Sequence, residues 1–178
     1  MKKLLFQLGL GAWYEETFTA AERAAMEVKA DFSGCGYNGT PAGFLADLSA
    51  YFNTKAEHGI CARIMKKAEE LPLPDEIMAQ HFFFMHMINF YYKNRDQEGY
   101  MEKAVEYCKK QIAIAPEAAV LFRNDSPYLP SHTGYEQLAI IEKKNKNWQA
   151  VVDLCTQAKS QGWGGDWDKR IEEAQKKL

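Results

Sequence analysis

The chain has 178 residues, of which 47% are hydrophobic and 13% aromatic, and its formal net charge is −2. This composition is typical of a globular domain with a real core and argues against a disordered chain. No long run of lysine and arginine is present, so we expect no nucleic-acid partner. Residues 1–16 begin with two lysines and an apolar run that Gln7 and two glycines interrupt. We therefore expect a buried segment there rather than a signal peptide.

The spacing of the four cysteines indicates a reducing compartment. Cys35, Cys61, Cys108 and Cys155 are widely spaced, and none belongs to a C-x-x-C pair. This spacing argues against a zinc ribbon and against a small disulfide framework. We expect free, buried thiols in a reducing cytoplasm, with Cys35 as the exposed one because it lies in a glycine-rich loop.

The first predicted helix covers residues 20–32. Thr19 and Glu22 form a capping-box pattern in front of it. The glycine-rich stretch 33–39 then marks a boundary. We predict an N-terminal segment over residues 1–39, with one helix, that packs on or flanks the rest of the chain. Residues 40–178 are predicted to form a helical repeat domain.

A helix pair is predicted directly after this boundary. Thr40 is the expected cap, and Pro41 stands in the first turn. Apolar residues recur at helical spacing, break near residues 57–59 and resume up to Leu71. The prolines of 72–75 end the pair, because proline cannot continue the hydrogen-bond ladder.

Residues 76–93 form the most apolar predicted helix. Gln80, His81, His86 and Asn89 lie inside it, and these polar side chains argue against a membrane span. A helix that is apolar on most sides must be covered on most sides, so we expect it at the centre of the molecule.

The remaining predicted elements are helices, and no strand is expected after residue 40. A helix over 99–116 precedes a loop over 124–130. Thr133 and Glu136 form a second capping-box pattern. The helices that follow are predicted at 132–145, at 147–161 and, as a short final element, from Trp167 to Leu178.

An offset of 47 residues relates two of these helix pairs. In the second helix of each pair the matched residues are Met101 with Trp148, Ala104 with Val151, Val105 with Val152, and Cys108 with Cys155. In the first helix they are Ile88 with Tyr135, Tyr91 with Leu138, and Tyr92 with Ala139. Each pair exposes an apolar face that a neighbouring pair must cover, which is the logic of a helical solenoid.

At these residues the chain resembles the tetratricopeptide repeat family. The clearest copy is 134–163, where the residues that match the family's two helices and final turn are Tyr135, Leu138, Ala139, Trp148, Val151, Cys155, Ala158 and Gly162. The period of 47 departs from the family's, which is roughly 34, and the extra length lies in 117–130. Residues 41–71 do not follow the offset. The resemblance implies an all-α, short, right-handed solenoid of helix pairs with a C-terminal capping helix.

The resemblance also implies a concave groove, lined by the first helix of each pair, that holds a peptide or a partner helix. By register, its residues would be His86, Asn89, Lys93, Thr133, Glu136, Ile140, Lys143 and Lys144. Asn89 lies in an apolar helix, where a buried amide needs a hydrogen-bond partner. That partner is either a bound peptide backbone or a neighbouring loop of the core. Lys93 and Lys143 either orient an acidic group or complement a helix dipole.

Two other kinds of site were weighed. Met85, His86 and Met87 carry soft ligands for copper, but adjacent helical residues point in different directions, so core packing is favoured. Cys35 is the one candidate nucleophile, and no histidine is paired with it in sequence. We therefore predict no catalytic residue, no metal site and no cofactor.

The function predicted is a non-catalytic scaffold that binds a protein or peptide partner in the groove. The alternative is a small-molecule or metal-binding helical protein that uses the Met-, His- and aromatic-rich helix 76–93. Self-association into a homo-oligomer stays open, because solenoid ends and exposed apolar patches pair readily. Neither nucleic acid nor membrane is expected as a partner.

Overall fold

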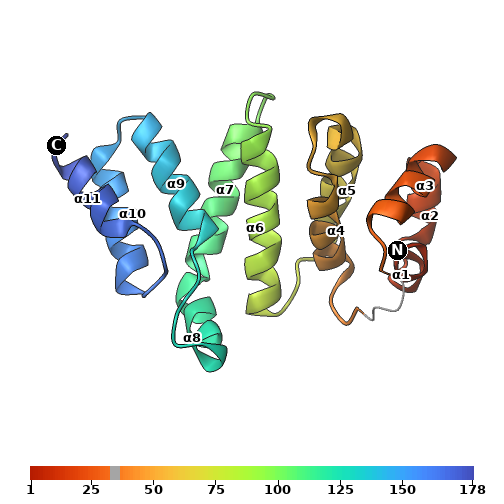
Figure 1. Ribbon diagram of the computed structural model, residues 1–178, viewed down its shortest axis with the longest axis horizontal. Coiled ribbons are helices and arrows are strands. Elements are labelled where there is room, and N and C mark those ends of the chain that lie inside the picture. The colour runs from red at the N-terminus through yellow and green to blue at the C-terminus, as the bar shows by residue number, and fades with distance from the viewer. Residues whose placement is uncertain (33–36) are drawn as a thin grey trace. The chain divides into compact units, whose positions relative to one another are not determined.

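The computed structural model describes residues 1–32 and 37–178 (Figure 1). Within these ranges it has eleven α-helices, two short 3-10 helices and one isolated β-bridge, between Ser131 and Gly164, and it has no strand. The prediction of an all-α fold is confirmed. Cys35 and the glycines beside it lie outside the described residues.

The chain divides into two compact units, Met1–His86 and Met87–Leu178, called unit 1 and unit 2 below. Unit 1 holds α1 (Lys2–Gln7), α2 (Gly11–Thr17), α3 (Ala20–Lys29), α4 (Pro41–Ser49), α5 (His58–Glu70) and the first part of α6 (Ile77–Lys93). Unit 2 holds the rest of α6, α7 (Tyr100–Ala113), α8 (Ala115–Asp125), α9 (Thr133–Lys144), α10 (Trp148–Ser160) and α11 (Trp167–Gln175). The predicted domain boundary at residue 39 lies inside unit 1 and stays a prediction.

The N-terminal segment has three helices where the sequence predicts one. α1 and α2 have six and seven residues, and neither has a side-chain cap. Helices this short are marginal on their own, so burial of Leu5 and Tyr14, both 0% exposed, must hold them. The predicted box before α3 is confirmed, since Thr19 and Glu22 exchange both hydrogen bonds. α3 ends at Lys29, three residues before the predicted end.

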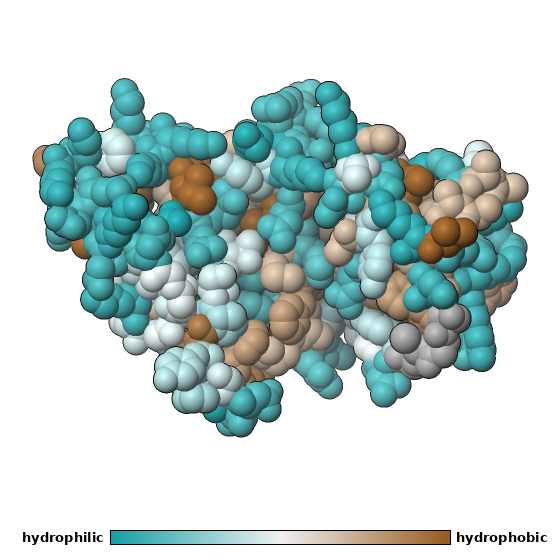
Figure 2. Space-filling view, in the orientation of Figure 1, coloured by the Kyte–Doolittle hydropathy of each residue, from teal (hydrophilic) through white to brown (hydrophobic). Residues whose placement is uncertain are grey.

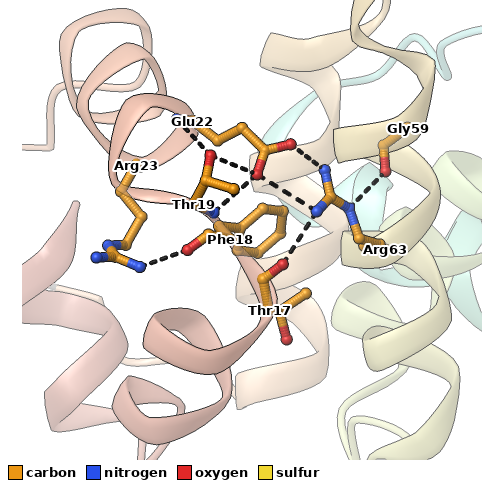
Figure 3. A network of polar contacts seen from close by, with 7 residues as sticks. All are labelled: Thr17, Phe18, Thr19, Glu22, Arg23, Gly59 and Arg63. Carbon is orange, nitrogen blue, oxygen red and sulfur yellow. Dashed lines mark hydrogen bonds and ion pairs between the residues drawn. The ribbon is translucent and has the colours of Figure 1, made fainter.

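Arg63 of α5 ties this segment to the rest of unit 1 (Figure 3). Its guanidinium donates to both carboxylate oxygens of Glu22 and, at 3.0 Å, to the carbonyl oxygen of Thr17. It also lies 4.6 Å from the centre of the Phe18 ring. Hydrogen bonds from Arg63 and Thr19 favour the charged carboxylate and lower the pKa of Glu22 to about 2. The network joins residues 41 positions apart in the chain.

We expect Glu22→Gln to lower the free energy of unfolding by about 1–2 kcal/mol at pH 7, because the amide keeps the size but loses the charge that Arg63 binds. Urea denaturation measures it. The control is Glu172→Gln, which removes the exposed pair with Lys176 and should cost under about 0.5 kcal/mol. Equal losses in the two variants would contradict a structural role for the network.

The predicted pair of helices over 41–71 is present as α4 and α5, which pack against each other. Thr40 caps α4 by accepting a hydrogen bond from the Gly43 amide at 3.2 Å, and Pro41 stands in the first turn. The side chains that the two helices bury include Phe44, Leu45, Leu48, Ile64, Met65 and Ala68. α6 follows within one residue of its predicted start. In the part of the chain that the structure describes, no helix is long and apolar enough to cross a membrane.

The predicted helix over 99–116 is interrupted before Pro116, its last residue. Pro116 stands in the first turn of α8 rather than at the end of helix 99–116, and α7 ends earlier, at Ala113. Proline lacks an N–H, which suits the first turn of a helix as well as the position after its end. The first residues of the stretch 117–130 are therefore helical, and only the part after Asp125 is a loop.

The N-terminus of α9 also differs from the prediction. The cap is His132 and not Thr133: His132 Nδ1 accepts a hydrogen bond from the Tyr135 amide at 3.3 Å. The buried Gln111 side chain of α7 accepts from the Gly134 amide at 2.7 Å. A Cβ at Gly134 would lie 3.0 Å from the Cys108 carbonyl oxygen, so glycine permits this close approach of α7 and α9.

The last three helices confirm the predicted elements. α10 ends at Ser160, and Gly162, in the turn that follows, has a φ of +84°. Gly164 donates from its amide to the Pro130 carbonyl oxygen at 3.0 Å, and so joins the turn after α10 to the loop before α9. Trp167 is buried and donates from its indole to the Trp163 carbonyl oxygen at 2.7 Å. This contact holds α11 against the end of α10.

Candidate functional site

The candidate site is the outer side of α9 in unit 2, called the α9 surface below. It comprises the half-buried and exposed side chains of Thr133, Glu136, Gln137, Ile140, Lys143 and Lys144. Lys144 donates from its ammonium group to the hydroxyl of Tyr92 in α6 at 2.8 Å. Lys143 forms an ion pair of 2.8 Å with Glu173 of α11. The C-terminal end of α9 is thus joined to the end of α6 by Lys144 and to α11 by Lys143, while α9 packs on α7 and α10.

Helical geometry explains this division of the α9 surface. Residues four apart share a side, so Thr133 and Gln137 lie on the side of Lys144, and Glu136 lies on the side of Lys143. Ile140 stands between the two sides and is half-buried. Figure 2 shows mainly hydrophilic residues over α11 and the C-terminal end of α9, with a small hydrophobic area among them. The α9 surface is thus a small apolar centre flanked by charges.

The side toward α11 carries charges of both signs. Burial raises the pKa of Glu136, Arg170 opposes this rise, and Asp166 adds to it. Arg170 in turn donates to the Asp166 carboxylate, and the Lys143–Glu173 pair lies on the same side. The charges here compensate one another.

The side toward α6 is different, because two cations, Arg95 and Lys144, lie there at the Tyr92 ring. The guanidinium of Arg95 lies 4.6 Å from the centre of the Tyr92 ring and donates to the Tyr92 carbonyl oxygen at 2.9 Å. The ammonium of Lys144 lies 5.4 Å from the same ring centre. Among the described residues, no carboxylate lies within ion-pair distance of Arg95 or Lys144. We call Tyr92, Arg95 and Lys144 the Tyr92 cluster.

Comparison of the chain with family models, with curated proteins and with solved structures gave no match. The resemblance to tetratricopeptide repeats therefore stays a prediction that rests on the residues alone.

The predicted groove residues are not all gathered on the α9 surface. Thr133, Glu136, Ile140, Lys143 and Lys144 lie on it together. His86 belongs to unit 1, where its Nε2 lies 3.2 Å from the carboxylate of Asp47 in α4. Asn89 and Lys93 are exposed on α6 in unit 2. The expectation that Asn89 is a buried amide is wrong, and so is its placement against a loop of the core.

Sequence reasoning missed Tyr92 and Arg95 as parts of the site. The 47-residue offset matches Tyr92 with Ala139, and Tyr92 was considered only as a repeat position. The available signal was its large ring, at a position where the other copy has a methyl group. Arg95 follows the end of α6 and has no periodic partner, so no pattern marks it. Only the fold brings Lys144 to Tyr92, which is 52 residues away in the chain.

The cysteines and the candidate metal ligands were the other residues considered for a site. Cys61, Cys108 and Cys155 are buried, as predicted, and Cys108 and Cys155 are free thiols. Burial raises the pKa of the Cys108 thiol to about 12 and that of Cys155 to about 11, so both remain protonated and unreactive at neutral pH. In residues 1–32 and 37–178, no group of three or more His, Cys, Asp or Glu side chains is placed to hold a metal ion.

Proposed function

We infer that the protein is a non-catalytic scaffold that binds a protein or peptide partner on the α9 surface. One observation carries this proposal: α9 is contacted by α6 and α11 on its two sides, yet its outer side keeps a row of partly exposed residues around Ile140. A small apolar centre with a charged rim is the usual composition of a recognition surface. Apolar contacts would supply affinity, and the flanking charges would set the orientation of the partner.

We also propose that the helix pairs form a tetratricopeptide-like, right-handed solenoid with α11 as its cap. Within unit 2, α7 packs on α9, α9 on α10, and α10 on α11, as successive helices of a solenoid do. The residue pairs related by the 47-residue offset support the idea, because Ala104 and Val151 are both buried, and so are Cys108 and Cys155. The free, buried thiols of Cys108 and Cys155 favour a reducing compartment, and we propose the cytoplasm.

The binding proposal is tested by capture of partners from a lysate of the source cells, with the full-length chain as bait. We expect Ile140→Glu to reduce the captured partner at least tenfold, because it places a charge at the apolar centre of the α9 surface. Mass spectrometry measures the captured proteins, and circular dichroism checks that the variant stays helical.

The matched control is Val120→Glu, which places the same charge on a residue of α8 that is 59% exposed. We expect this variant to capture the same partners as the unaltered chain. Equal capture by the unaltered chain and the folded Ile140→Glu variant would overturn the proposed site, because binding would then not involve the α9 surface.

A further inference from the structure

We propose that the Tyr92 cluster recognises a phosphorylated side chain of the partner. This inference rests on the proposed function, since it names the chemistry that one side of the α9 surface would bind. The cluster combines two cations and a phenol hydroxyl at the C-terminal ends of α6 and α9. The absence of a carboxylate beside Arg95 and Lys144 in the described residues is the starting observation.

The two cations of the cluster contact the same ring, and neither forms an ion pair with a carboxylate of the described residues. Their distances to the centre of the Tyr92 ring are 4.6 and 5.4 Å, so the two charges are at most about 10 Å apart, which is close to one Debye length at physiological salt. Two other lysines of unit 2 that lie near aromatic or helical neighbours do have acidic partners: Lys110 pairs with Glu106, and Lys143 with Glu173. The Tyr92 cluster is therefore suited to bind an anion from outside the described chain.

The helix termini explain only part of this charge. The C-terminal end of a helix carries roughly half a negative charge, so the ends of α6 and α9 together offset about one of the two positive charges. Arg95 does donate to a terminal carbonyl oxygen, that of Tyr92, but this bond uses one of its five N–H donors.

The donors favour a phosphate ester over a carboxylate. The guanidinium of Arg95, the ammonium of Lys144 and the hydroxyl of Tyr92 are three separate donor groups, and the Tyr92 oxygen already accepts from Lys144, which leaves its hydrogen to donate. A phosphate ester has three terminal oxygens and a charge near −2 at neutral pH, which matches three donor groups and two cations. A carboxylate carries a single negative charge, so it would leave one of the two cations without a counter-charge. Arginine with lysine is also the usual composition of phosphate-recognition sites.

The direct test uses short alanine-rich peptides that carry one central phosphoserine, glutamate or serine. Fluorescence anisotropy with the full-length protein measures each dissociation constant. We expect the phosphoserine peptide to bind at least tenfold more tightly than the glutamate peptide. We also expect Lys144→Gln and Arg95→Gln each to weaken it at least tenfold. Equal binding of the phosphoserine and glutamate peptides, or no binding of either, would overturn the proposal.

The matched control for these variants is Lys110→Gln. Lys110 also lies over a tyrosine ring, 4.9 Å from the centre of Tyr107, but it is paired with Glu106. We expect this variant to bind the phosphoserine peptide as the unaltered protein does. A weakening equal to that of Lys144→Gln would show a general charge effect and would overturn the specific site.

Phosphatase treatment of the lysate before capture separates this inference from the proposed function. If the inference is correct, treatment reduces the captured partner at least tenfold. If capture resists phosphatase but is lost in Ile140→Glu, the scaffold function stands and the phosphate inference fails. If capture resists both changes, the α9 surface itself is wrong, and the two proposals fail together.

Discussion

Acidification from pH 6.5 to pH 5 is expected to lower the free energy of unfolding by about 2 kcal/mol through His81 alone, and by about 3 kcal/mol at pH 4. His81 lies in the unit 1 part of α6 and is 3% exposed. Burial disfavours the charged imidazolium and lowers the pKa of His81 from 6.5 to about 4. The unfolded chain therefore takes up the proton first. The contribution of His81 is complete above pH 6.5 and is lost as the pH falls through about 4.

The measurement is urea denaturation at several pH values between 7 and 5, a window above the ordinary titration of carboxylates. The variant His81→Leu fills the buried position with an apolar group that does not titrate, so we expect its stability to change little over this window. The control is His58→Gln, at the partly exposed start of α5, which should keep the full loss. A loss in His81→Leu as large as that of the unaltered chain would exclude His81 as the cause.

The second large effect is expected at the start of α9. We predict that His132→Ala lowers the free energy of unfolding by about 3–4 kcal/mol, because it removes a helix cap and leaves a cavity. The His132 side chain is fully buried, and its ring lies 4.8 Å from Tyr135 and 4.6 Å from Trp163, measured between ring centres.

Two further variants separate the cap of α9 from the packing of its ring. His132→Asn keeps an acceptor for the Tyr135 amide, so we expect it to recover about 1 kcal/mol of the loss. Thr133→Ala tests the cap that the sequence predicts, and we expect a cost of at most about 0.5 kcal/mol because Thr133 does not cap α9. Chemical denaturation measures all three. A cost of Thr133→Ala equal to that of His132→Ala would show that the cap is assigned to the wrong residue.

Local signals were sufficient to predict most of the helices. Thr19 with Glu22, and Thr40 with Pro41, act through bonds within one helical turn, so the sequence contains all the information that these starts require. The same holds for the turn after α10, where the positive φ of Gly162 favours glycine. Apolar periodicity predicted α6 to within one residue of its start, because a long apolar run at helical spacing has few alternatives.

Predictions were wrong where two equally good local choices compete. Both His132 and Thr133 can accept the hydrogen bond that caps α9, and packing of the His132 ring against Trp163, far away in sequence, decides between them. Pro116 fits either the end of one helix or the start of the next. α1 and α2 have no side-chain cap that a pattern could reveal, and they depend on burial by the rest of unit 1.

For the candidate site, the sequence by itself determined which residues share α9, because helical periodicity alone places Thr133, Glu136, Ile140, Lys143 and Lys144 along one helix. Only the tertiary structure decided that Lys143 faces Glu173 while Lys144 joins Arg95 at Tyr92. The physical reason is the range of the interactions. Helical periodicity arises from bonds four residues apart, whereas the charge balance around a side chain depends on neighbours that only packing brings near.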